Sequence, residues 1–186
     1  MKHSSKLFAA LAFAGTVFFT GNAKGQITPV NTLRFGVGAE SGITTGAISG
    51  APNAYVGATG RLQYSLSEKF ALTLTSGYYN FFGTQYHNSM GMIPVKVGFK
   101  YFVGSGFYFS GEAGAGFELQ NFNVVNDPND KSPGTRLLWS AGFGYATKSW
   151  DFGARYENFS GSTTYAGQNN SYGLVGLRVG HGFGLK

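Results

Sequence analysis

The 186-residue sequence has no cysteine and little charge. Without cysteine the chain has no disulfide framework, no thiolate metal site, no cysteine nucleophile and no lipid anchor on cysteine. Charged residues make up 12% of the sequence, about half of the roughly 25% that is usual in soluble domains. After residue 25 the sequence also lacks any apolar run of the length that a transmembrane helix needs, which is about 20 residues. An ordinary soluble surface and a helical membrane protein are therefore both disfavoured.

Glycine and aromatic residues are abundant, with 30 glycines, 18 phenylalanines and 11 tyrosines. The glycines follow no three-residue period, which excludes collagen. So many large aromatic side chains also exclude a disordered chain. The length fits one domain.

Residues 1–25 have the pattern of a secretory signal peptide. Lys2 and Lys6 precede an apolar stretch over residues 7–19, and small residues before the cleavage site allow cleavage after Ala23 or, as we favour, after Gly25. The mature domain is then 26–186. Removing Lys2, Lys6 and Lys24 lowers the formal charge from +6 to +3. The remaining basic residues are scattered, so nucleic-acid binding is not expected.

The rest of the sequence alternates apolar and polar residues with the period of a β-strand. Strands about 11 residues long and tilted about 40° rise roughly 28 Å, which matches the apolar band of an outer-membrane barrel. The connections alternate between long and short, as in an up-and-down antiparallel barrel that has short periplasmic turns and both termini in the periplasm. The sequence thus predicts an all-β, eight-stranded antiparallel transmembrane barrel, with strands at 31–42, 54–66, 70–82, 92–102, 107–119, 135–146, 150–159 and 171–183.

The charged residues of these strands all fall on the parity opposite the large apolar residues. A register slip of one residue would turn seven basic side chains toward lipid, at about 2–4 kcal/mol each near the midplane. The register is therefore fixed by charge. The predicted interior charge network consists of Arg34, Glu40, Arg61, Lys96, Lys100, Glu112, Glu118, Arg136, Asp151, Arg155, Glu157 and Arg178.

Parity alone leaves open which face lies inside, and a secreted lipocalin-like lipid carrier with an apolar cavity is the soluble alternative. Twelve charges of both signs among many glycines are too few for the surface of a soluble protein but suit a narrow lumen. Paired inside, these charges form a closed salt-bridged plug, which we favour over a narrow ion channel. Two outward aromatic girdles are predicted, with Phe70, Tyr101, Phe107, Tyr145 and Trp150 at the short turns and Tyr55, Tyr78, Phe117 and Tyr156 at the long loops.

The mature chain resembles the small outer-membrane β-barrels of the OmpA/OmpX type, and its hairpin over 93–102 and 107–117 is similar to the central hairpin of the PorT-like outer-membrane barrels. The resemblance implies outer-membrane lipid and lipopolysaccharide as surroundings and the barrel insertion machinery as a partner in biogenesis. Such barrels usually end in an aromatic residue, whereas this chain ends in Lys186, and Phe183 is the nearest substitute. The family does not fix a function.

Few residues suggest a catalytic or metal-binding role. The step from His87 to Ser89 is similar to the catalytic stretch of outer-membrane lipid A deacylases, but here it falls in a long loop, and a solvated histidine is favoured. Oxygen donors gather at 126–130 without the full spacing of a calcium loop, so a polar turn is favoured there. No cofactor or metal is predicted. We expect a monomeric, non-enzymatic barrel with a structural or adhesive role through four extracellular loops.

Overall fold

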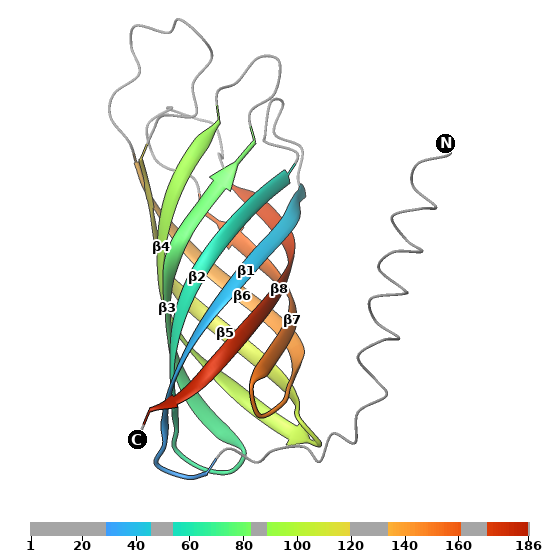
Figure 1. Ribbon diagram of the computed structural model, residues 1–186. Coiled ribbons are helices and arrows are strands. Elements are labelled where there is room, and N and C mark those ends of the chain that lie inside the picture. The colour runs from blue at the N-terminus through green and yellow to red at the C-terminus, as the bar shows by residue number, and fades with distance from the viewer. Residues whose placement is uncertain (1–28, 46–53, 83–88, 120–133, 161–170, 186) are drawn as a thin grey trace, which may run out of the picture.

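The computed structural model describes residues 29–45, 54–82, 89–119, 134–160 and 171–185, which form one closed antiparallel barrel (Figure 1). Among these residues there is no helix that is long and apolar enough to cross a membrane. The expected signal peptide at 1–25 lies outside the described residues. The strands are β1 (Leu33–Thr45), β2 (Ala54–Ser65), β3 (Phe70–Phe81), β4 (Met90–Gly104), β5 (Phe107–Glu118), β6 (Thr135–Ala146), β7 (Trp150–Phe159) and β8 (Tyr172–Leu185).

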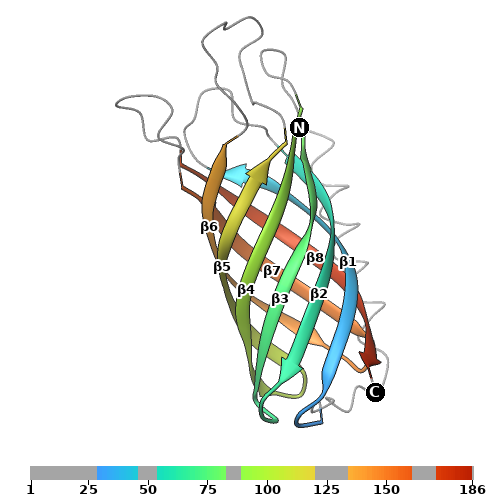
Figure 2. The same cartoon turned by 90° about the vertical axis from the view of Figure 1, so that its left-hand side faces the viewer.

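The prediction of eight antiparallel strands is confirmed, and β6 and β7 have the predicted bounds. The largest differences are at β1, which continues to Thr45, and at β4, which begins at Met90. Each strand pairs with its neighbours in sequence, and β1 closes the barrel by pairing with β8 from Leu33 opposite Leu185 to Thr45 opposite Gly173 (Figure 2). Closure leaves no unpaired strand edge, which is the condition for a sheet that is surrounded by lipid.

Three short turns connect β2 to β3, β4 to β5 and β6 to β7 at one end of the barrel, which we call the short-turn end; the opposite end is the long-connection end. Between Gly104 and Phe107 the two-residue turn Ser105-Gly106 has positive φ at both positions (46° and 90°). This is the geometry of a type I′ turn, whose twist matches that of the flanking strands. In the β6–β7 turn the hydroxyl of Thr147 accepts a hydrogen bond of 3.0 Å from the backbone N–H of Trp150.

The outer face of the barrel is apolar along every strand. Large side chains such as Leu137, Phe143 and Val97 are each more than 60% exposed, and they alternate with inward residues. A water-soluble barrel does not display such a surface. The lipocalin-like alternative, which needs this apolar face inside, is therefore wrong.

Aromatic side chains lie outward near both ends of the barrel, as predicted. At the short-turn end the ring centroids of Phe107 and Tyr145 lie 4.8 Å apart, and those of Trp150 and His181 lie 5.0 Å apart. The prediction is wrong for Tyr55, which is only 1% exposed. Tyr55 shares the parity of Arg61 and points into the barrel, so period-two alternation assigns it correctly once it is applied to the whole strand.

Candidate functional site in the barrel interior

At the long-connection end the interior is filled by apolar and aromatic side chains, which we call the apolar layer. Phe81 lies at its centre, in contact with the rings of Phe159 and Tyr172, each at a centroid distance of 6.1 Å. All these side chains are less than 8% exposed, as in a close-packed protein core. The layer consists of Tyr55, Tyr79, Phe81, Met90, Met92, Leu138, Phe159, Tyr172 and Leu174.

Glycines on neighbouring strands make room for the rings. A Cβ atom added at Gly176 would lie 2.3 Å from the Tyr55 hydroxyl oxygen, and one added at Gly57 would lie 2.5 Å from a ring carbon of Tyr79. Both distances are far below van der Waals contact, so these positions require glycine. Pairing a glycine with a large ring is how this narrow interior accommodates its aromatic residues.

Below the apolar layer lies the core of the predicted charge network. The ammonium group of Lys96 is completely buried and contacts Glu157 at 3.0 Å and Glu112 at 3.4 Å. It also donates a hydrogen bond of 2.9 Å to the hydroxyl of Tyr79. A buried ammonium is stable only with such partners, because isolated burial of a charge is prohibitive.

Two arginines connect this cluster around the barrel wall. Arg155 pairs with Glu40 and with Glu157, the latter at 2.8 Å. Arg178 approaches Glu40 at 3.3 Å from the neighbouring strand. The ion pairs join β1, β4, β7 and β8 across the lumen, so they tie together strands that are distant in sequence.

Arg61 continues the network toward the short-turn end. Its guanidinium donates hydrogen bonds to Glu112 at 3.0 Å and to the hydroxyl of Thr75 at 2.9 Å. The hydroxyl of Thr75 in turn donates to the same Glu112 oxygen at 2.9 Å. These contacts hold the Glu112 carboxylate in place between cations.

Among the carboxylates of the interior network, Asp151 lies nearest the short-turn end. It pairs with Lys100 and accepts a hydrogen bond of 2.6 Å from the hydroxyl of Tyr108, while Arg61 and Arg178 each lie 3.8 Å away. One carboxylate is thus shared by three cations. Arg34 lies nearby on β1 and donates a hydrogen bond of 2.5 Å to the backbone carbonyl of Lys148.

The remaining pair of the predicted set, Arg136 with Glu118, lies apart from this network. Both residues are at the long-connection end, where the guanidinium of Arg136 donates to Glu118 and also lies 5.3 Å from the ring of Tyr172. The apolar layer separates this pair from the central charges. The interior is therefore stratified, with an ion pair, an apolar layer and then the central network.

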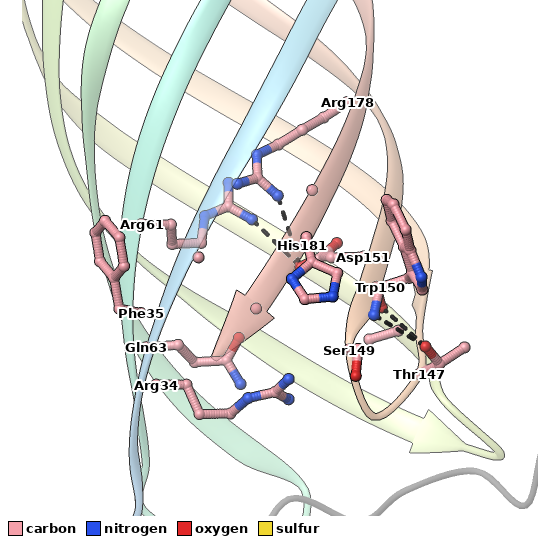
Figure 3. Close-up of a pocket in the computed structure, with 14 residues that line it drawn as sticks. Arg34, Phe35, Arg61, Gln63, Thr147, Ser149, Trp150, Asp151, Arg178 and His181 are labelled. Atoms are coloured by element: carbon pink, nitrogen blue, oxygen red, sulfur yellow. Dashed lines mark hydrogen bonds and ion pairs between the residues drawn. The ribbon is translucent and has the colours of Figure 1, made fainter. Parts of the chain in front are cut away.

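A cavity of about 30 Å³ opens at the short-turn end, below the network (Figure 3). Its wall includes Arg34, Arg61, Gln63, Asp151 and Arg178, together with glycines of β1 and β8. This volume is far below that of an engineered cavity that holds benzene, about 150 Å³. The cavity therefore suits water or a small ionic group and excludes a lipid acyl chain.

Sequence reasoning placed the charges but missed the apolar layer. Its members share the parity of the charged residues, as Met92 does with Lys96 and Leu174 does with Arg178, so the parity pattern contained the signal. His87 and the segment 126–130 lie outside the described residues, and Ser89 is exposed just before β4. Within the part of the chain that the structure describes, no three potential metal ligands gather.

The fold is that of the small eight-stranded barrels of the outer membrane. Comparison with solved structures agrees. The chain is similar to Ail, the attachment invasion locus protein of Yersinia pestis, with a TM-score of 0.57 and 13% identity over 83% of this chain and 100% of that one. No protein-family model matches the sequence, and no curated protein matches it either.

Two further solved structures share the fold. The N-terminal β-barrel domain of Pseudomonas aeruginosa OprF is 17% identical over 84% of this chain and 100% of that one, with a TM-score of 0.53. Neisserial surface protein A is 14% identical over 82% of this chain and 97% of that one, with a TM-score of 0.51. At these identities the likeness establishes the fold alone.

Proposed function

We propose that the protein is a monomeric, non-enzymatic outer-membrane barrel that anchors its long connections at the cell surface for a structural or adhesive role. The observation that carries the membrane part is the division between the two faces of the sheet. The outer face is apolar with aromatic girdles, and the inner face holds paired charges. In water this arrangement would expose the apolar face, whereas in a membrane lipid covers it.

Export and orientation belong to the same proposal. Residues 1–25 direct secretion and are removed, and the insertion machinery folds the barrel among outer-membrane lipids and lipopolysaccharide with both termini in the periplasm. N-terminal sequencing of the mature protein checks the cleavage site. We expect Gln26 as the first residue; Lys24 would indicate cleavage after Ala23, and Met1 would contradict export by this signal.

Envelope fractionation tests the localisation. We expect the protein in the outer-membrane fraction, and we expect the unheated sample to migrate differently from the boiled one on an SDS gel, because a closed barrel resists SDS until it is heated. A protein that is soluble in the periplasm or the medium and shows no heat shift would contradict the membrane proposal.

An adhesive role is supported by the architecture. The outer face of the barrel body is mostly apolar and the interior is largely filled by side chains, so we expect surface recognition to fall to the connections. Ail, which shares the fold, is named for attachment and has been solved in complex with a heparin analogue. The test replaces residues 120–133 with a two-residue Asn-Gly turn and measures attachment of expressing cells to immobilised glycans and matrix proteins. We expect attachment to fall while the heat shift remains; equal attachment by both proteins would argue against adhesion through this segment.

A narrow channel is the second candidate, and the packed interior argues against it. The apolar layer and the ion pairs of Lys96 and Arg155 fill the lumen in series. We expect purified protein in planar bilayers to give no discrete conductance steps. Reproducible steps from the wild-type protein would show that the lumen opens.

The lipid A hydrolase remains a candidate only through His87 and Ser89. We expect the Ser89→Ala variant and the wild-type protein to give the same number of acyl chains on lipid A by mass spectrometry. A deacylated lipid A that depends on Ser89 would make the protein an enzyme.

A further inference from the structure

The cavity at the short-turn end has the features of an anion site. We propose that it binds one phosphate-class oxyanion between the guanidinium groups of Arg34 and Arg178, with the amide of Gln63 as an additional donor. The inference does not depend on the orientation of the barrel in a membrane or on the role of its connections.

The first support is the placement of the two guanidinium groups. A Cβ atom added at Gly182 would lie 3.0 Å from Nη2 of Arg34, and one added at Gly180 would lie 2.5 Å from Nη1 of Arg178. The two groups therefore lie over two glycines that are neighbours on the same face of β8. Such neighbours are roughly 7 Å apart, which leaves space for one small anion between the two groups.

The second support is the pairing of charges. Among the described residues Arg34 has no carboxylate within ion-pair distance, whereas Arg61 and Arg178 have Glu112 and Glu40 as partners. Asp151, the one carboxylate in the cavity wall, is already paired with Lys100. The cavity thus carries an excess of positive charge, which an anion would compensate.

The third support is an unused donor. Gln63 is 8% exposed and lines the cavity, and its side-chain amide forms no hydrogen bond with any residue in the described ranges. The register places Gln63 opposite Arg34 on the adjacent strand. The amide borders the cavity, so an oxyanion held by Arg34 would accept the N–H of Gln63.

The chemistry of these donors selects the class of ligand. Guanidinium groups form paired hydrogen bonds with carboxylates and with phosphates, and phosphate has enough oxygens and charge to engage both guanidinium groups at once. The cavity is too small for a sugar or a nucleotide. A free phosphate or the phosphate of a lipid headgroup at the barrel rim would satisfy the same donors.

The test uses the full mature barrel refolded in dodecylmaltoside, which contains no phosphate. Amide NMR signals of Gly36, Gly180 and Gly182, which line the cavity, are followed as inorganic phosphate is added, with sodium gluconate holding the ionic strength constant. We expect saturable shifts at these glycines and none at Gly57, which lies against Tyr79 in the apolar layer. Absence of saturable shifts at the cavity glycines would overturn the proposal.

Two variants and a control decide whether the named side chains bind the anion. Arg34→Gln removes one charge-assisted interaction and should weaken phosphate binding at least about tenfold, and Gln63→Leu should weaken it by a smaller factor. Lys69→Gln makes the same charge change in an exposed turn at the same end of the barrel and should alter affinity less than about twofold. Equal effects of Arg34→Gln and Lys69→Gln would refute the site. The heat shift on SDS gels establishes that each variant is folded, and Gln63→Leu keeps the test valid if Arg34→Gln does not fold.

The same titration in phosphatidylglycerol nanodiscs distinguishes the two sources of phosphate. If a headgroup fills the site, added phosphate no longer shifts the cavity glycines in nanodiscs, and Arg34→Gln changes their resting chemical shifts. If the site takes a free anion, the response in nanodiscs equals that in micelles. Either result supports the site when the micelle titration is positive.

Discussion

The two halves of the narrow barrel interior are filled by different kinds of side chain. The half toward the long connections is closed by aromatic, methionine and leucine side chains that pack on glycines, whereas the other half is filled by ion pairs and ends in a small cavity. Apolar packing needs shape complementarity and no partners, while buried charges need partners with correct geometry. The first half therefore closes the lumen, and the second fixes the register of the strands.

The largest effect is expected in the charged half. Lys96→Met leaves the carboxylates of Glu112 and Glu157 without their shared cation and should lower the free energy of unfolding by about 3–5 kcal/mol. Urea unfolding in lipid vesicles measures the change. The double variant Lys96→Met/Glu157→Gln removes one of the stranded charges and should recover part of the loss; an unaltered loss would show that the ion pair does not couple the two residues.

A smaller effect is expected in the apolar half, where two adjacent leucines on β6 provide a matched pair. Leu138 is completely buried in the lumen and Leu137 is 66% exposed on the outer face. Leu138→Ala should cost about 3 kcal/mol because it leaves a cavity. Leu137→Ala should cost about 1 kcal/mol, since lipid chains fill the vacated space.

The same urea titration compares the two leucine variants. A larger loss for Leu137→Ala than for Leu138→Ala would contradict the assignment of inner and outer faces on this strand.

The smallest effect is expected at the turn that joins β4 to β5. Gly106 has a φ of 90°, and a Cβ atom there would lie 2.4 Å from the carbonyl oxygen of Ala146, so Gly106→Ala should cost about 1–2 kcal/mol. Gly184 has no heavy atom within 4 Å of an added Cβ, and Gly184→Ala should change stability by less than about 0.5 kcal/mol. Thermal unfolding of the two variants checks the difference, and equal midpoints would show that the turn tolerates a side chain.

Much of the barrel follows from local sequence because the constraint that lipid imposes is simple. A lipid-facing position excludes charge, so the parity of residues such as Lys96, Arg155 and Arg178 identifies the inner face of each strand. The alternation of long and short connections then gives the topology. The predicted strand ends are less accurate than the predicted topology. For example, β1 continues to Thr45 through residues that also suit a loop.

The interior could be predicted only in part. Inner positions tolerate both charged and apolar side chains, so parity places Tyr55 and Phe81 inside without indicating that they pack into a layer. Which cation pairs with which carboxylate depends on side-chain reach across the lumen, as in the contact of Arg61 on β2 with Glu112 on β5. The order of residues along one strand does not indicate such contacts between distant strands. The cavity at the short-turn end could not be predicted for the same reason.

The central claim is that the apolar face meets lipid and the charged face lies inside. Because the chain has no cysteine, single cysteines introduced along β6 at positions 137 to 141 and at 143 can each carry a spin label. Gly142 and Gly144 are left unchanged, since an added Cβ there would lie within 2.6 Å of a backbone carbonyl oxygen of β7. Their accessibility to oxygen, which dissolves in lipid, and to a water-soluble nickel complex is then measured in bilayers. The account predicts high oxygen accessibility at 137, 139, 141 and 143 and low accessibility to both reagents at 138 and 140. High nickel accessibility at the odd-numbered positions would contradict it.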